Sequence, residues 1–373
     1  MVACDSMQDL ISSYTSIVGK PRLKPRYALG YHQACYGYED QESVLESVNE
    51  YRKAGIPLDG MYIDVDMHFP DPIGMFKTLR EQGVKYSTNI TPYISFMPSD
   101  TYNTLNEGLK EGHSIMDDRD LDPTAPEAYK QHYQRLNVGK QIFKVPVMQK
   151  PDYFEPDTLD FNQTFSNKQP FHGGVFYGWR NGYPGYYPNL NDKEVRRWWG
   201  KQYKYLFECG LDFIWQDMTG PCIAEEYGDM KGLPFRLNLD SNGWCQDYSR
   251  MDRKRAIEIW SLYSYNLHKA TYHGMNNIDE ISPQHKWREN RRNFIIGHGS
   301  FVGSHRFAGL WTGDNASTWE SLDISVAQVL DLGMSGIALN NAGGRGLTRT
   351  LARGGFIAMN ITRQTHRKER DKG

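Results

Sequence analysis

Short apolar runs alternate with amphipathic stretches from Tyr27 onward, and this pattern predicts parallel strands connected by helices. We expect strands at residues 28–32, 60–66, 84–90, 211–217, 292–298 and 335–339. We expect helices at residues 42–55, 73–83, 192–210, 254–274 and 320–333, with Gly55 and Gly83 at helix C-termini. In a chain of 373 residues, this order of elements predicts an α/β fold of the (β/α)8 TIM-barrel type.

The regular pattern is interrupted in the middle of the chain. Between about residues 98 and 190, Pro, Gly, Asp and Tyr dominate, which predicts a long insertion at the mouth of the barrel. After the apolar run at 335–339 no further strand is legible. We therefore expect a barrel that is incomplete at its C-terminal end, because closure of a full barrel needs further strands.

The end of the chain differs in composition from the rest. Residues 345–373 carry eight Lys or Arg against two acids, which predicts a disordered basic tail. Arg345, Arg349 and Arg353 recur every four residues, so the alternative is a basic helical face that binds an anion. The predicted domains are a lead-in segment at 1–25, a catalytic barrel at 26–340 with the insertion at about 98–190, and a basic tail at 341–373.

Net charge and aromatic content indicate which classes of ligand this chain is suited to bind. The formal net charge is −2, which favours neither nucleic acid nor an acidic membrane surface, whereas an aromatic fraction of 13% suits stacking against sugar rings. The five Cys have neither disulfide nor metal-ligand spacing, so we expect reduced thiols. The chemistry expected of the site residues requires no metal and no cofactor. The first twenty residues lack the apolar core of a signal peptide, and no membrane-length run is present, which predicts a cytoplasmic protein.

Two aspartates are candidates for catalysis. Asp217 follows the apolar run LDFIW and should project from the C-terminal end of a parallel strand, where barrel enzymes carry catalytic groups. Asp314 lies in a Gly-bounded turn after Trp311, a setting that desolvates a carboxyl and favours its protonated form. Retaining cleavage of a glycoside needs such a pair, about 5 Å apart. The structural alternatives are a helix N-cap for Asp217 and a plain turn for Asp314.

A second acidic pair, Asp64 and Asp66, stands two residues apart at a strand end and should face one side of the sheet. We interpret this pair as a site that binds sugar hydroxyls through both carboxylates. A metal site and a solvated strand end are the alternatives. Trp215 shares the face of Asp217, either as part of the core or as a platform for a sugar ring.

The motifs RYALGYHQACYGYE, YIDVDM, STNITP, FIWQDMT, GDMKGLP, YSYNLHKATYHG and RFAGLWTGDNAS together resemble glycoside hydrolase family 31, and within it the α-1,4-glucan lyases, over roughly residues 10–337. The resemblance implies that Asp217 is the nucleophile and Asp314 the acid, and that Asp64 binds hydroxyls of the sugar. It also implies that His298 replaces a sugar-binding Arg of the family. The residues expected to line the sugar site are Asp64, Trp215, Met218, His298, Arg306 and Trp311.

Thr219 distinguishes two outcomes of the implied chemistry. Hydrolases of the family commonly have Asn after the Asp-Met pair, whereas this chain has Thr219, as the lyases do. The resemblance thus implies elimination from a covalent glucosyl intermediate to 1,5-anhydrofructose, with starch, glycogen or maltosaccharides as substrate. An α-glucosidase is the first alternative and an inactive barrel fragment the second. The β-rich domains that flank the family's barrel are not recognisable in this sequence.

Overall fold

The computed structural model describes residues 4–35, 38, 40–64, 69–95, 102–118, 166–173, 176–177, 180–181, 185–220, 223–224, 230–231, 237–240, 253–259, 261–277, 291–313, 318–343 and 355–357. The chain forms two compact units. The first contains Met1–Ile90, Tyr203–Asp217 and Tyr272–Gly373, and the second contains Thr91–Gln202 and Met218–Thr271.

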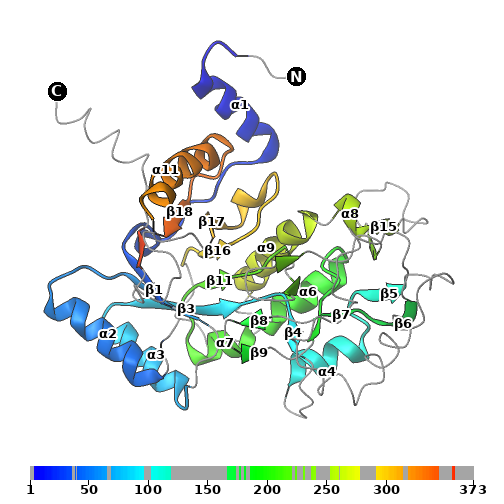
Figure 1. Ribbon diagram of the computed structural model, residues 1–373, viewed down its shortest axis with the longest axis horizontal. Coiled ribbons are helices and arrows are strands. Elements are labelled where there is room, and N and C mark those ends of the chain that lie inside the picture. The colour runs from blue at the N-terminus through cyan, green and yellow to red at the C-terminus, as the bar shows by residue number, and fades with distance from the viewer. Residues whose placement is uncertain are drawn as a thin grey trace. The chain divides into compact units, whose positions relative to one another are not determined.

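The first unit is built on a closed barrel (Figure 1). Its strands are β1 (His32–Cys35), β2 (Gly60–Ile63), β3 (Lys85–Ile90), β11 (Ile214–Gln216), β16 (Ile295–Gly297), β17 (Gly309–Trp311), β18 (Asn340–Gly343) and β19 (Gly355–Ile357). Their order around the barrel is β1-β19-β18-β17-β16-β11-β3-β2. Every pairing from β1 through β2, β3, β11, β16 and β17 to β18 is parallel. β19 differs, because it pairs antiparallel with both β1 and β18.

This topology confirms the TIM-type barrel and its incomplete C-terminal end, but several strands differ from the prediction. The strand expected at 335–339 lies at Asn340–Gly343, mostly within the predicted basic tail. Gly309–Trp311 forms a strand that was not predicted. Gly355–Ile357 also forms a strand, although the sequence of the basic tail predicted none. The remaining residues of that tail beyond Gly343, and the three arginines that suggested a helical face, lie outside the described residues. The eighth position of the barrel is thus filled by an antiparallel strand instead of a complete βα unit.

Large apolar side chains that point inward fill the barrel. Alternate residues of a strand face opposite sides, so Phe213 and Trp215 share the inner face of β11 and its approach. Phe213 is fully buried and packs against Tyr62 and Phe294, with ring centroids 5.1 Å apart in both pairs. The whole interior cluster consists of Ala28, Ala34, Tyr62, Phe213, Trp215, Phe294, Ile296 and Trp311, with Tyr27 and Leu339 packed against it.

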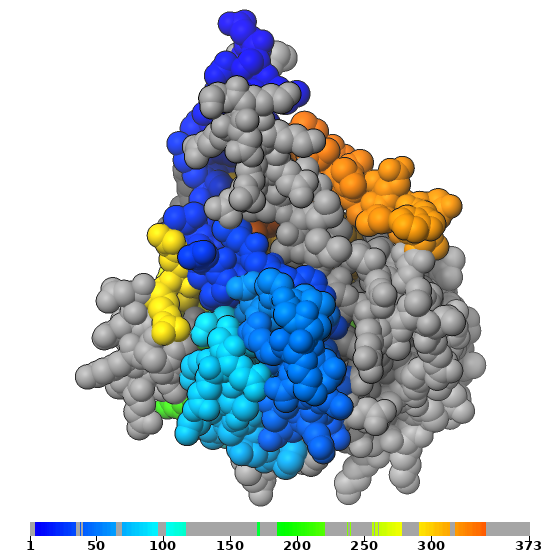
Figure 2. All heavy atoms as spheres, turned by 90° about the vertical axis from the view of Figure 1, so that its left-hand side faces the viewer, coloured from blue at the N-terminus to red at the C-terminus, as the bar shows by residue number. Residues whose placement is uncertain are grey.

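The first unit also contains helices. They are α1 (Met7–Val18), the 3-10 helix η1 (Arg26–Leu29), α2 (Gln41–Lys53), α3 (Pro72–Glu81), α7 (Lys204–Cys209), the 3-10 helix η5 (Ser304–Arg306) and α11 (Trp319–Met334). Figure 1 shows α2 and α3 side by side, and Figure 2 shows them as neighbouring blue and cyan surfaces. Both helices are followed by a glycine in the left-handed region, Gly55 at φ 67° and Gly83 at φ 77°, which confirms the predicted C-termini.

Lys24 is buried in this unit and is expected to reduce its stability at neutral pH. Its Nζ donates to the carbonyl of Phe307 at 3.0 Å. Burial, and to a smaller extent the charge of Arg22, lowers the pKa of Lys24 from 10.5 to about 8. Between these two pH values the unfolded chain holds a proton that the folded chain has released, so the free energy of unfolding rises with pH.

We therefore expect Lys24→Met to have a higher free energy of unfolding than the native chain at pH 7. This difference should shrink by about 3 kcal/mol as the pH rises from about 8 to 10.5. Urea denaturation of both proteins at several pH values between 7 and 10.5 measures this difference. Lys20→Met, at an exposed lysine of the same segment, is the control. A gap between Lys24→Met and the native chain that stays constant with pH would contradict the expectation.

The second unit combines short strands with helices. The strands are β4 (Ile94–Ser95), β5 (Met116–Asp118), β6 (Ser166–Pro170), β7 (His172–Gly173), β8 (Phe176–Tyr177), β9 (Arg180–Asn181), β10 (Gly185–Tyr186), β12 (Ile223–Ala224), β13 (Met230–Lys231), β14 (Asn238–Asp240) and β15 (Arg253–Arg255). The helices are α4 (Asn103–Lys110), α6 (Lys193–Gln202) and α8 (Ala256–Ile259), and α9 (Ser261–Asn276) begins in this unit and has its residues from Tyr272 onward in the first. The predicted helix at 192–210 is thus two helices, α6 and α7, which meet at Tyr203.

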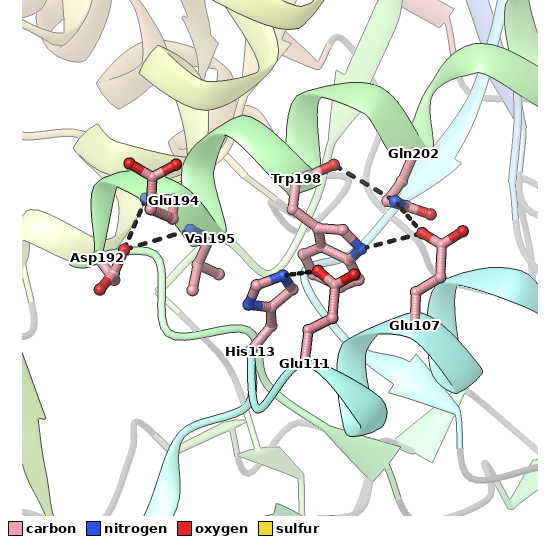
Figure 3. A network of polar contacts seen from close by, with 8 residues as sticks. All are labelled: Glu107, Glu111, His113, Asp192, Glu194, Val195, Trp198 and Gln202. Atoms are coloured by element: carbon pink, nitrogen blue, oxygen red, sulfur yellow. Dashed lines mark hydrogen bonds and ion pairs between the residues drawn. The ribbon is translucent and has the colours of Figure 1, made fainter.

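Polar contacts connect α4 to α6 within this second unit (Figure 3). Trp198 Nε1 and Gln202 Nε2 both donate to Glu107, at 3.3 and 3.2 Å. His113 contacts Glu111 at 2.8 Å and packs against the Trp198 ring. Most of the predicted insertion between about residues 98 and 190 lies outside the described residues, but its first part contains α4 and therefore regular structure.

Candidate active site

Four polar side chains continue the inward-facing rows of the barrel, three of them just after the last residue of a strand and the fourth, Asn89, near the end of β3. Asp64 lies two residues after Tyr62, Asp217 two residues after Trp215, and His298 two residues after Ile296. Asn89 lies two residues after the buried Ser87 on β3. Alternation along each strand directs all four toward the same interior, at the C-terminal end of the parallel strands. This is the end at which barrel enzymes place their reacting groups.

Both carboxylate oxygens of Asp217 accept hydrogen bonds. Oδ1 accepts from His298 Nδ1 at 3.2 Å, and Oδ2 accepts from Asn89 Nδ2 at 2.9 Å. The backbone is also held, since Asp217 N donates to the Ile90 carbonyl at 3.0 Å. The Asp217 side chain keeps 20% of its surface exposed. It is therefore an oriented carboxylate that an external molecule can still reach.

His298 is positioned by a tryptophan. Its ring stacks on that of Trp311 with centroids 4.6 Å apart and an interplanar angle of 26°. Gly313, at φ 88°, allows the close approach of this ring, because a Cβ at that position would lie only 2.6 Å from His298 Nε2. An ionised carboxylate only accepts, so the contact with Asp217 requires a proton on Nδ1 of His298.

The two tryptophans predicted at the sugar site, Trp215 and Trp311, are both buried. Trp215 is 5% exposed and Trp311 3% exposed, and their rings meet edge to face at 6.0 Å. Of the two alternatives for Trp215, the structure favours the core, since its ring also packs on Tyr62. Trp311 Nε1 is buried without a hydrogen-bond partner in the described part of the chain. The contact of Trp311 with His298 is made by the stacked face of its ring.

Other predicted site residues are placed differently. The backbone of Met218 has a positive φ of 47°, which bends the chain directly after Asp217. The Arg306 guanidinium lies over the Phe307 ring and its Nε donates to the Gly303 carbonyl, while its stem lies against Gly19. The sugar-binding role predicted for Arg306 stays a prediction. Asp314 and Asp66 lie outside the described residues, and the pairing of Asp217 with Asp314 stays a prediction.

Asn89 is a site residue that sequence reasoning missed. The motif STNITP contains it, but the sequence analysis gave its amide no chemistry. Its Nδ2 donates to Asp64 Oδ1 at 3.0 Å as well as to Asp217 Oδ2. Asn89 stands opposite Trp215 in the register of β3 and β11. A polar residue at the end of a strand, in line with a buried serine, is the signal that would have indicated it.

The described residues contain no group of three or more His, Cys, Asp or Glu side chains that could hold a metal ion. Within those same ranges, no helix has the length and apolar character needed to cross a bilayer.

Comparison with known proteins identifies the fold and the family. Residues 21–343 match the glycosyl hydrolases family 31 TIM-barrel domain. The chain is 25% identical over 372 residues to Alpha-glucosidase 2 of Bacillus thermoamyloliquefaciens, covering 94% of this chain and 38% of that protein. The crystal structure of the ER glucosidase II heterodimeric complex matches with a TM-score of 0.66 and 22% identity, over 92% of this chain and 31% of that one.

A lyase is also among the similar structures. The Gracilariopsis lemaneiformis α-1,4-glucan lyase, as a covalent intermediate complex, matches with a TM-score of 0.65 and 20% identity over 88% of this chain and 33% of that chain. An identity this low shows a shared fold only, so the predicted closeness to the lyases is not confirmed. The chain spans about a third of the length of these relatives. The match over residues 21–343 and the barrel together establish that the chain belongs to glycosyl hydrolase family 31, of which it contains the TIM-barrel domain.

Proposed function

We propose that this chain carries the catalytic region of a retaining α-glucosidase, with Asp217 as its nucleophile. The observation that carries the proposal is the Asp217 carboxylate, which ends an inward-facing row of the barrel, is partly exposed, and has both oxygens held by neighbouring side chains. A nucleophile needs this combination of orientation and access. The names of the similar proteins add support, since Alpha-glucosidase 2 and the ER glucosidase II complex are both glucosidases.

The proposed reaction has two steps. In the first, an Asp217 oxygen attacks the anomeric carbon of an α-glucoside, the bond to the leaving oxygen breaks, and that oxygen takes a proton from the acid, which we assign to Asp314. In the second, water attacks the same carbon, its proton returns to Asp314, and the ester to Asp217 breaks to release glucose with retained configuration. Asp64 binds sugar hydroxyls beside the nucleophile, and His298 stabilises the charge on Asp217.

The second candidate is an α-1,4-glucan lyase, and Thr219 is the observation that favours it. In that reaction no water attacks the glucosyl ester. The Asp217 carboxylate leaves C1 and takes the proton from C2, so that a double bond forms and 1,5-anhydrofructose results. Thr219 is buried, and its carbonyl accepts a hydrogen bond from Ser264 at 2.8 Å. This hydrogen bond holds the Thr219 backbone against α9.

Product analysis on maltose separates the two candidates. A hydrolase releases glucose from both sugar units, whereas a lyase releases one 1,5-anhydrofructose and one glucose. We expect glucose from both units, measured by chromatography with authentic standards after incubation of the purified chain. Peptide mapping after reaction with 5-fluoro-α-glucosyl fluoride identifies the labelled residue. A label on Asp217 would confirm that Asp217 is the nucleophile. Absence of both products and label would support the inactive alternative and refute the proposed function.

A further inference from the structure

Asn89 joins two carboxylates of the candidate active site through one amide nitrogen. Nδ2 donates to Asp64 Oδ1 at 3.0 Å and to Asp217 Oδ2 at 2.9 Å. The two acceptor oxygens are thus at most about 6 Å apart, a separation at which like charges repel each other appreciably in a partly buried site. The amide supplies one hydrogen to each carboxylate and so offsets part of this repulsion.

The orientation of the Asn89 amide follows from its neighbours. If the amide were turned over, Oδ1 would face two ionised carboxylates that cannot donate to it. In the observed orientation Oδ1 is instead buried and has no hydrogen-bond partner in the part of the chain that the structure describes. An unsatisfied buried acceptor reduces stability, and a residue that serves only packing would do better without it. The amide therefore indicates a role that depends on its two donated hydrogen bonds.

We infer that Asn89 is a positioning residue that fixes the nucleophile Asp217 relative to the sugar-binding Asp64 and keeps both carboxylates ionised. This inference rests on the proposed function for its catalytic part. The groups joined by these contacts are Asp64 and Asp217, bonded directly to the amide, and His298, bonded through Asp217. On the same strand, Lys85 forms an ion pair with Asp212 at 3.4 Å at the opposite end. Asn89 carries no charge at any working pH, so its contribution does not titrate.

The inference predicts a change in the pH dependence of activity. Asn89→Leu keeps a similar volume and removes both donated hydrogen bonds, and Asn89→Asp removes them and adds a negative charge. Loss of donors to the ionised form raises the pH at which Asp217 loses its proton, so the acid limb of kcat/KM should move up by about one pH unit in Asn89→Leu and further in Asn89→Asp. We also expect kcat to fall more than KM changes, since the alignment of the attacking oxygen is lost.

Ser87→Ala is the matched control, because Ser87 is fully buried on the same face of β3 and donates only to the adjacent Thr88 carbonyl in the contacts that the structure describes. This variant should keep the native acid limb. A purely structural role for Asn89 would lower activity equally at all pH values. If both Asn89 variants retain the acid limb of the active native chain, the positioning role is wrong while the proposed function stands.

A stability measurement tests the same inference without activity. The amide stabilises the ionised carboxylates, so its contribution is present at neutral pH and is lost as the pH falls through the range in which they take up protons. The Tm of the native chain minus the Tm of Asn89→Leu should therefore be larger at pH 7 than at pH 4. A difference that does not change with pH would overturn the inference, whether or not the native chain cleaves glucosides.

Discussion

Asp217→Asn is expected to lower glucoside cleavage by on the order of 10³-fold or more and to abolish covalent labelling by 5-fluoro-α-glucosyl fluoride. Asparagine has nearly the same shape, but its amide is a far weaker nucleophile than a carboxylate. The Asp217 side chain contacts the partly exposed His298 and the uncharged Asn89, so the fold should tolerate the loss of its charge. Initial rates on an aryl α-glucoside and intact-mass spectra after labelling measure both effects.

The control for this prediction is Asp323→Asn, at an exposed aspartate on α11. It changes the same functional group and should leave both the rate and the labelling unchanged. Small external anions provide a further check. In Asp217→Ala they can occupy the space of the missing carboxylate, so azide should restore part of the turnover and yield a glycosyl azide. Labelling of Asp217→Asn at the native rate would show that another residue forms the covalent bond.

Phe213→Ala is expected to destabilise the barrel by about 3–5 kcal/mol. Phe213 is fully buried at the centre of the interior cluster, where its ring contacts Tyr27, Tyr62 and Phe294. Truncation removes apolar contacts and leaves a cavity that rings from several strands cannot easily collapse to fill. Urea denaturation followed by tryptophan fluorescence measures the change.

Trp319→Ala serves as the comparison for Phe213→Ala. Trp319 is 83% exposed at the start of α11, so removal of its ring should change the free energy of unfolding by less than about 0.5 kcal/mol. An equal loss in the two variants would mean that the interior cluster contributes no more than the surface does. Such a result would contradict the barrel interior described above.

The alternation of apolar and polar positions was sufficient to predict most strands of the barrel, but it did not detect the shortest strands. β17 is only Gly309–Trp311, too few residues to show a period of two, and its glycine weakens the strand signal. The first strand was predicted at 28–32 but lies at His32–Cys35, because Pro25 precedes a 3-10 turn over Arg26–Leu29. β19 was missed for a related reason, since its three residues occur in a basic segment.

The site was partly predictable from the sequence. Acidic residues that directly follow an apolar run can be recognised in the sequence, whereas a residue whose role depends on its contacts in the folded chain cannot. Asp217 and Asp64 both follow apolar runs and were selected on that basis. Asn89 was not, because its importance comes from two carboxylates that are distant in the sequence and meet only after the strands pair in register. The sugar contact predicted for His298 stays a prediction, and its hydrogen bond to Asp217 could not be read from the sequence.

The reversed direction of β19 determines which sequence changes next to this strand affect the end of the barrel where Asp217 lies. In the parallel strands, the residues after the last strand position reach the end where Asp217 lies. In β19 the relation is inverted, because Gly355 pairs with Gln33 and Phe356 with His32, so its first residue is nearer that end. Insertions or substitutions upstream of Gly355, and not downstream of Ile357, are the ones that would alter the entrance at this position.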